Sequence, residues 1–206
     1  MSILEWPKAV IPTQENWQLL SNSKTFTSPF NGSSQTVRFP GSRWRCELTF
    51  NNLNEEKSRQ LEALVASLDG MSGRVKIASW IRKGRYGYGS PRIAIPSQLG
   101  DRLETKDWKR NMRVLQQGDR LTVGNELKMV VADVVSDNQG RAIILISPML
   151  RTSPAVNEML EVERPFVGFF GSLIMNRVNF SIVAWGIPIS RYLLRRCCTN
   201  AISSIF

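Results

Sequence analysis

The feature that most restricts the fold of this 206-residue chain is a regular alternation of side-chain polarity over residues 43–50. Four apolar residues alternate with four polar or charged ones, namely Trp44, Cys46, Leu48 and Phe50 against Arg43, Arg45, Glu47 and Thr49. Successive side chains of a β-strand point to opposite faces, so a period of two predicts a strand with one buried face and one charged face. Such a half-buried strand is typical of antiparallel sheet.

The residues that follow this strand change to a helical period. Four apolar side chains are spaced as one stripe of a helix, namely Leu61, Leu64, Val65 and Leu68. Asn54 precedes them as a candidate N-cap, and two glutamates occupy the first turn, where the helix dipole favours anions. We therefore predict one amphipathic helix over residues 54–69 that packs on the sheet, with Gly70 as its left-handed C-cap.

Most of the remaining chain is predicted to form short strands separated by turns. Apolar and β-branched runs predict strands at residues 74–81, 93–95, 121–123, 126–135, 142–146 and 160–163. The run over residues 142–146 is apolar throughout, which predicts a strand buried on both faces. Small and polar residues predict a loop over residues 21–34, and the polar residues 98–108 are expected to connect two halves of the fold.

These patterns predict a mainly β fold of the α+β class, with antiparallel sheets and one amphipathic helix. We expect a β-sandwich-like N-terminal domain over residues 1–97, followed by a β-meander or small barrel over residues 98–170. A basic C-terminal segment covers residues 171–206, in which residues 179–182 fit a strand and residues 191–198 fit a short helix. A chain of this length buries a sizeable core without disulfides or metals.

Positive charge is concentrated in the middle of the chain. The sequence has 27 Lys and Arg against 17 Asp and Glu, which gives a net charge of +10. Residues 74–113 hold eleven of the cations and three acids, a local excess of +8, and residues 171–206 hold four arginines and no acid. An anionic partner is therefore expected to meet the 74–113 region.

The absence of histidine excludes several classes of chemistry. With no histidine, the chain has no Ser-His-Asp triad, no Cys-His pair and no His-containing zinc site. The three cysteines form neither a CxxC motif nor a disulfide framework, because Cys46 is far from the adjacent pair Cys197 and Cys198. Cys46 lies on the apolar face of its strand, as expected of a small buried hydrophobe. We expect no enzymatic activity, no catalytic residues, no cofactor and no metal.

Neither end of the chain shows a signal for export or membrane insertion. Glu5 and Pro7 interrupt the N-terminus before a signal-peptide apolar run begins. The apolar stretch over residues 182–189 is much shorter than the roughly 20 residues that a spanning helix needs. We therefore expect no membrane insertion.

The candidate contact residues lie in a loop rich in glycine and tyrosine, residues 82–92. Its glycines match neither the dinucleotide-binding fingerprint nor the P-loop, so a flexible loop or interface arm is favoured over a nucleotide site. Tyrosine and arginine are enriched at protein–protein contacts, and they also stack on bases and pair with phosphates. The candidates for subunit or partner contacts are Arg82, Lys83, Arg85, Tyr86, Tyr88 and Arg92.

Two longer stretches, on either side of the predicted Leu61–Leu68 helix, resemble a known family. Residues 26–53 read FTSPFNGSSQTVRFPGSRWRCELTFNNL, and residues 115–151 read LQQGDRLTVGNELKMVVADVVSDNQGRAIILISPMLR. In this order they resemble distal tail proteins of long-tailed bacteriophages, especially those of Gram-negative hosts. The resemblance covers roughly residues 1–165, and the basic segment 171–206 departs from it.

The resemblance implies a structural, non-enzymatic protein of the phage virion, located at the tail tip and assembled in the host cytoplasm. Such a subunit forms a homo-oligomeric ring, commonly a hexamer. The ring joins the tail tube protein to the hub or tip proteins and leaves a channel through which DNA passes without sequence-specific binding. The alternative from another class is a monomeric nucleic-acid-binding β module that uses the basic region 74–113.

Overall fold

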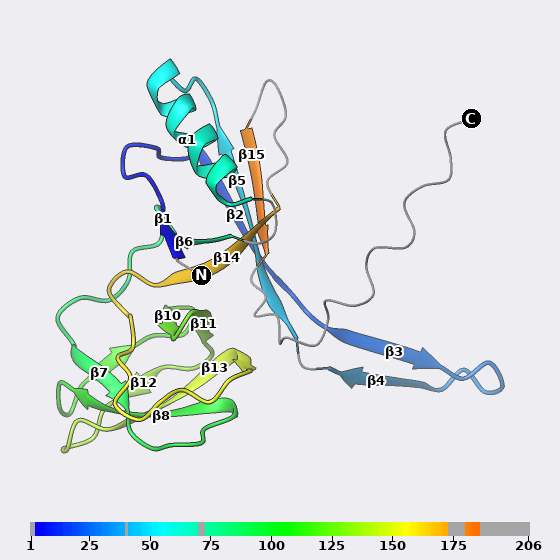
Figure 1. Ribbon diagram of the computed structural model, residues 1–206. Coiled ribbons are helices and arrows are strands. Elements are labelled where there is room, and N and C mark those ends of the chain that lie inside the picture. The colour runs from blue at the N-terminus through cyan, green and yellow to red at the C-terminus, as the bar shows by residue number, and fades with distance from the viewer. Residues whose placement is uncertain (1–2, 40, 70–72, 173–179, 186–206) are drawn as a thin grey trace.

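The computed structural model describes residues 3–39, 41–69, 73–172 and 180–185, and most of them belong to two β-sheets (Figure 1). The six-stranded sheet has the order β1 (Ile3–Glu5), β6 (Arg74–Ala78), β14 (Phe166–Ser172), β15 (Phe180–Trp185), β5 (Arg43–Phe50) and β2 (Gln14–Leu20). The five-stranded sheet has the order β10 (Arg120–Val123), β11 (Glu126–Val130), β13 (Ala142–Leu150), β8 (Gly100–Trp108) and β7 (Gly89–Ile93). All strand pairs in these sheets are antiparallel except β1 with β6.

Two smaller pairs and one helix complete the described chain. The pairs are β9 (Arg113–Leu115) with β12 (Val134–Val135), and β3 (Ser23–Thr27) with β4 (Ser34–Arg38). The helix α1 (Glu55–Ser67) is the only helix among the described residues. The predicted mainly β fold with antiparallel sheets and one helix is confirmed, and one of the sheets curls into a half barrel.

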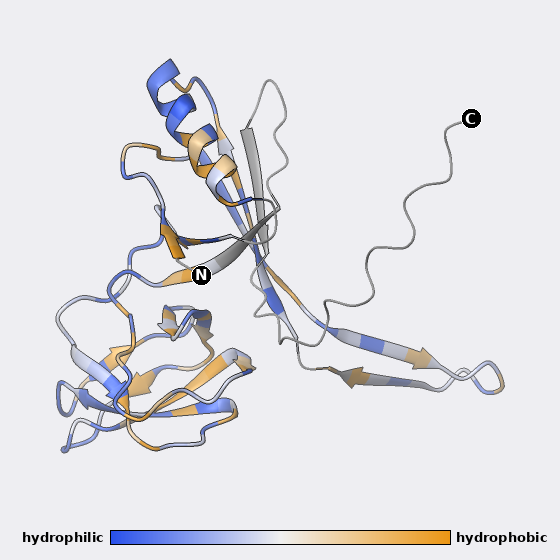
Figure 2. Cartoon of the chain, viewed as in Figure 1, coloured by the Kyte–Doolittle hydropathy of each residue, from blue (hydrophilic) through white to orange (hydrophobic). Residues whose placement is uncertain are grey.

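The strand and helix with the clearest sequence periods fold as predicted. On β5 the four apolar residues are buried and the four polar ones are only partly buried. Asn54 caps α1, because its side-chain oxygen accepts a hydrogen bond from the backbone N–H of Lys57 at 3.0 Å. The predicted cap at Gly70 lies outside the described residues. Figure 2 shows that α1 is hydrophilic over its first turns and more apolar further on, where its leucines meet the sheet.

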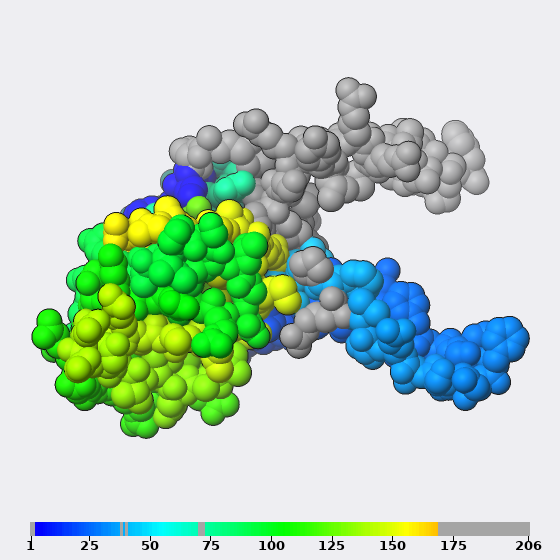
Figure 3. Space-filling view, turned by 90° about the horizontal axis from the view of Figure 1, so that it is seen from below, coloured from blue at the N-terminus to red at the C-terminus, as the bar shows by residue number. Residues whose placement is uncertain are grey.

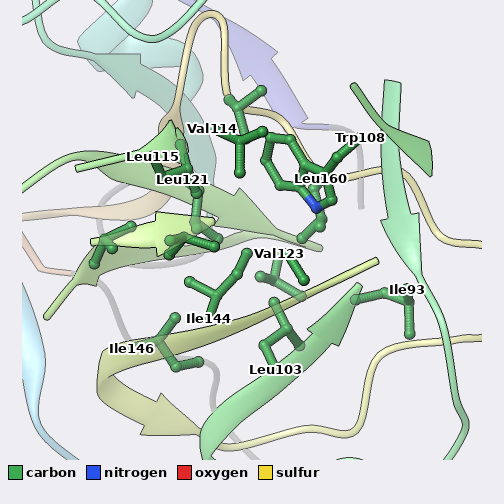
Figure 4. Packing of buried hydrophobic residues seen from close by; sticks show 14 of the residues in the cluster. Ile93, Leu103, Trp108, Val114, Leu115, Leu121, Val123, Ile144, Ile146 and Leu160 are labelled. Atoms are coloured by element: carbon green, nitrogen blue, oxygen red, sulfur yellow. The ribbon is translucent and has the colours of Figure 1, made fainter. Parts of the chain in front are cut away.

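Each large sheet has its own hydrophobic core. The first core joins β5, β6 and α1 and includes Trp44, Cys46, Leu48, Phe50, Leu61, Leu64, Val75 and Ile77. The second core lies within the five-stranded sheet and its connections, where the residues labelled in Figure 4 point toward one another. Those residues are Ile93, Leu103, Trp108, Val114, Leu115, Leu121, Val123, Ile144, Ile146 and Leu160.

Contacts of Trp44 and Arg120 connect the two sheets. The indole N–H of Trp44, on β5, donates to the backbone carbonyl of Leu127 on β11 at 2.9 Å. The guanidinium carbon of Arg120, on β10, lies 4.9 Å from the ring centroid of Trp17 and 5.2 Å from that of Trp44. These contacts join β2 and β5 of the six-stranded sheet to β10 and β11 of the five-stranded sheet, and Leu127 of β11 also packs into the first core.

The prediction that residues 98–108 form a polar connection is wrong, because Gly100–Trp108 is the central strand β8. Its inward-facing residues are Leu103, Thr105 and Trp108, all buried. Asp107 has a φ of 67°, which interrupts the extended backbone and turns Trp108, rather than Asp107, into the core. This one-residue shift breaks the period of two that identifies a strand in the sequence.

The prediction that residues 142–146 are buried on both faces is also wrong. On β13 the side chains of Ile143 and Leu145 are 49% and 41% exposed, while their neighbours along the strand are buried. Ile143 pairs with Glu104 and Leu145 with Arg102, so the outer face of this strand is mixed with charged residues. An apolar run alone therefore does not establish that both faces of a strand are covered.

Three other expectations have different outcomes. Residues 21–34 were expected to be a loop but contain β3 and the beginning of β4. The sequence does not reveal this hairpin, because its side chains are mostly polar and form no apolar face. The expected strand at 160–163 is reduced to an isolated bridge between Thr122 and Glu161. The expected strand at 179–182 corresponds to β15, whereas the expected helix at 191–198 lies outside the described residues.

Candidate assembly interface

The hairpin of β3 and β4, here called the arm (residues 23–38), extends away from both sheets (Figures 1 and 3). Its two strands pair from Ser23 with Arg38 to Thr27 with Ser34. At the tip, Ser28 N–H donates to the carbonyl of Ser33 at 2.8 Å, and Gly32 has a φ of 69°. A left-handed backbone there favours glycine, so the Asn-Gly turn fixes the end of the arm.

The arm follows the end of β2 and precedes the beginning of β5, so it continues that strand pair outward. At its base, the backbone N–H of Phe39 donates to the carbonyl of Asn22 at 2.8 Å. Beyond this point neither β3 nor β4 forms a ladder with any other described strand. The arm is therefore attached to the molecule at one end only within the described chain.

The arm exposes large apolar side chains to water, and this exposure does not stabilise a monomer. Phe26 on β3 is 55% exposed, and Phe30 at the tip is 97% exposed. A two-stranded hairpin is marginally stable in water by itself, and its outer edges carry backbone groups ready to pair with another chain. Both features make the arm suited to bind a protein surface.

Three of the six predicted contact residues are engaged within their own chain. Arg85 Nε lies 2.8 Å from Asp119 Oδ2, and this hydrogen bond raises the pKa of the guanidinium above its ordinary value. Arg92 Nη1 donates to the carbonyl of Asn157 at 3.0 Å. Tyr88 is partly buried against the second core. These contacts fix the loop to the five-stranded sheet.

The other three predicted residues, Arg82, Lys83 and Tyr86, are exposed. Gly84, between them, lets the backbone approach closely, because a Cβ there would lie 2.1 Å from the carbonyl oxygen of Val162. Arg85 N–H then donates to that same carbonyl at 2.9 Å. The loop is therefore anchored at its centre, and it presents two cations and one tyrosine outward.

Among the residues that the structure describes there is neither a cluster of metal ligands nor an accessible thiol. No three His, Cys, Asp or Glu side chains gather there in an arrangement able to hold a metal ion. Cys46 is fully buried, and burial raises the pKa of its thiol above the ordinary range. No helix among the described residues is long and apolar enough to cross a membrane.

No model of a known protein family matches the chain, and no curated protein matches its sequence. The resemblance to distal tail proteins therefore stays a prediction that rests on the residues quoted for it.

The sequence predicts a contact site in the 82–92 loop, which stays a prediction, and it does not predict the arm. The available signal was the Asn31-Gly32 turn, which is common in hairpins, between two stretches containing Thr, Phe and Val. The signal is weak because neither face of the hairpin is continuously apolar. A hairpin that no other described element covers does not need such a face.

Proposed function

We propose that this chain is a structural subunit of a bacteriophage tail that closes with copies of itself into a ring. The ring joins the tail tube to the hub or tip proteins and leaves a channel for DNA. The hexameric stoichiometry and the tail location come from the resemblance of residues 26–53 and 115–151 to distal tail proteins.

The observation that carries the proposal is the exposed arm. An arm on one side of a subunit that binds a different surface of the next subunit makes a head-to-tail contact, and such contacts generate a ring when the rotation closes. Burial of Phe26 and Phe30 by a neighbour contributes about 1.5–3 kcal/mol for each phenylalanine that becomes fully buried. Pairing of the open strand edges adds backbone hydrogen bonds to that gain.

The first experiment is a measurement of the mass of the purified full chain by light scattering behind a sizing column. We expect a closed oligomer close to six times 23.3 kDa. A shortened variant replaces residues 24–37 by Asn-Gly. It keeps Ser23 and Arg38, the paired residues at the foot of the arm, and removes the rest of the arm. This variant is expected to be monomeric and to unfold at the same urea concentration as isolated wild-type subunits.

A point variant and its matched control refine this test. Phe26→Ser is expected to weaken the oligomer, whereas Ile95→Ser, which removes a comparably exposed apolar residue from the five-stranded region, leaves it intact. A monomeric wild-type chain that binds duplex or single-stranded DNA with a steep salt dependence would instead support the nucleic-acid-binding module. In that case Arg82→Glu and Lys83→Glu weaken DNA binding, and removal of the arm does not.

A further inference from the structure

The free edge of β2 borders an acidic hollow. β2 is the last strand of the six-stranded sheet, so among the described strands it has a partner on one side only. A shallow hollow of about 510 Å³ lies beside it, and no lysine or arginine lines it. The charged residues of its lining are Glu15 and Glu47, and the apolar residue is Ile81.

The acids of this hollow differ in their contacts. The carboxylate of Glu15 accepts hydrogen bonds from the Ser79 hydroxyl and from the backbone N–H of Trp80 at 3.0 Å, so its charge is already partly compensated. Glu47 is partly buried on the polar face of β5, where Asn16 of β2 is its cross-strand partner. Ile81 is 72% exposed, and its backbone N–H donates to the Glu15 carboxylate at 3.3 Å, so it lies on the Glu15 side of the sheet.

One face of the arm carries the complementary groups. Lys24 and Phe26 alternate with Thr25 on β3, so they lie on the same face, about 6.6 Å apart along the strand. The cross-strand partner of Lys24 is Val37, which adds an apolar side chain to that face. The opposite face carries hydroxyl side chains, such as the hydrogen-bonded Thr25 and Thr36.

The charges of the two surfaces are opposite. Residues 21–42 contain Lys24 and Arg38 and no acid, whereas the hollow contains two acids and no cation. β3 has five residues and β2 has seven, so the edge of β2 is long enough to receive a whole strand of the arm. Charge and strand length are therefore both compatible with strand addition at this edge.

The arm cannot reach the hollow of its own chain. Only Ser21 and Asn22 separate β2 from β3, and the arm points away from the six-stranded sheet (Figures 1 and 3). The occupant of the hollow must therefore come from another molecule. A second copy of this chain supplies the complementary face at the same concentration as the hollow itself.

We infer that the arm of one copy binds the acidic hollow beside β2 of the next copy, with Lys24 facing Glu47. This inference rests on the proposed ring and identifies its contact. Each subunit then uses its arm toward one neighbour and its β2 edge toward the other, which is the head-to-tail arrangement that a ring requires.

A charge exchange tests this contact directly. Lys24→Glu and Glu47→Lys each place like charges together, and each is expected to weaken association by at least about tenfold in light scattering. The double variant restores the opposite pairing and is expected to recover the wild-type mass. Glu62→Lys, on the exposed surface of α1, is the matched control and leaves the mass unchanged. Urea unfolding of every variant shows whether the subunit itself remains folded.

A second measurement does not depend on a stable ring. A carbodiimide couples a lysine amine to a carboxylate in direct contact, so it is expected to join Lys24 of one copy to Glu47 of another. Mixing isotopically labelled and unlabelled chains identifies the product as intermolecular by mass spectrometry. An oligomeric wild type with neither this cross-link nor any effect of the charge changes would overturn the docking site and leave the ring proposal standing. A monomeric wild type without the cross-link would overturn both.

Discussion

The pair of Lys128 and Glu126 provides a sharp test of how charge is buried in this fold. Lys128 is 1% exposed, and its ammonium donates to Glu126 Oε2 at 2.5 Å and to the carbonyl of Met149 at 2.8 Å. The Glu126 side chain keeps 20% of its surface exposed. Burial lowers the pKa of Lys128, and the Glu126 carboxylate opposes this shift. The buried charge of Lys128 therefore needs its partner more than the charge of Glu126 does, because Glu126 still contacts water.

This asymmetry predicts the effects of two substitutions. Glu126→Gln keeps the shape of the side chain but leaves a buried ammonium without its counter-charge, and is expected to cost about 3 kcal/mol of unfolding free energy. Lys128→Met removes the buried charge and fills a similar volume, while the Glu126 carboxylate still reaches water. The expected change for Lys128→Met is within about 1 kcal/mol of the wild type.

Urea unfolding at fixed protein concentration measures both free energies, and its pH dependence supplies an independent check. The folded-state pKa of Lys128 lies below its ordinary value of 10.5, so the unfolded chain binds this proton more tightly than the folded chain. Stability from this residue therefore rises with pH between the folded pKa and 10.5. The rise is expected to be larger in Glu126→Gln and absent in Lys128→Met. A harmless Glu126→Gln together with a Lys128→Met that costs 3 kcal/mol or more would refute the reasoning.

Three further predictions concern the first core and its edges. Asn54→Ala removes the N-cap of α1 and is expected to cost about 1 kcal/mol in urea unfolding, whereas no loss would mean that the cap is replaced by water. Trp44→Phe leaves the buried carbonyl of Leu127 without its donor and is expected to cost about 1–3 kcal/mol, measured in the same way. In a chain whose two C-terminal cysteines are replaced by serine, Cys46 is expected to react with a thiol reagent only after unfolding, because burial raises its pKa. Rapid reaction of the native protein would contradict this.

The elements that the sequence predicts well are those whose burial follows one uninterrupted period. β5 alternates over all eight of its residues, and the leucines of α1 form one stripe behind an asparagine cap. In both cases each local preference agrees with the tertiary packing. β8 was missed for the opposite reason, because the left-handed backbone at Asp107 moves Trp108 into the core one position out of phase.

The candidate site was predicted only in part, because assembly surfaces lack the signal that marks a core. In the 82–92 loop, the sequence indicates which side chains suit a contact but not which are engaged internally. The ion pair of Arg85 with Asp119 joins residues 34 positions apart, and no local pattern predicts it. The arm was missed because both of its faces contain polar residues. The role of the arm depends on which molecules contact it, and the period of side-chain polarity does not reveal those contacts.

The order of strands in the six-stranded sheet separates the proposed assembly surfaces from an inserted unit. β6 pairs with β14, where Ala78 opposes Phe166, so the chain leaves this sheet and returns to it at adjacent positions. Everything between them, including the five-stranded sheet, is therefore an insertion at one point of the six-stranded sheet. The β2 edge belongs to the six-stranded sheet, and the arm connects β2 to β5 of the same sheet, outside the insertion. If these two surfaces close the ring, then the exposed face of β13 with Ile143 and Leu145 is left available for a different partner. Substitutions on that face are then expected to change attachment to neighbouring proteins without changing the mass of the ring.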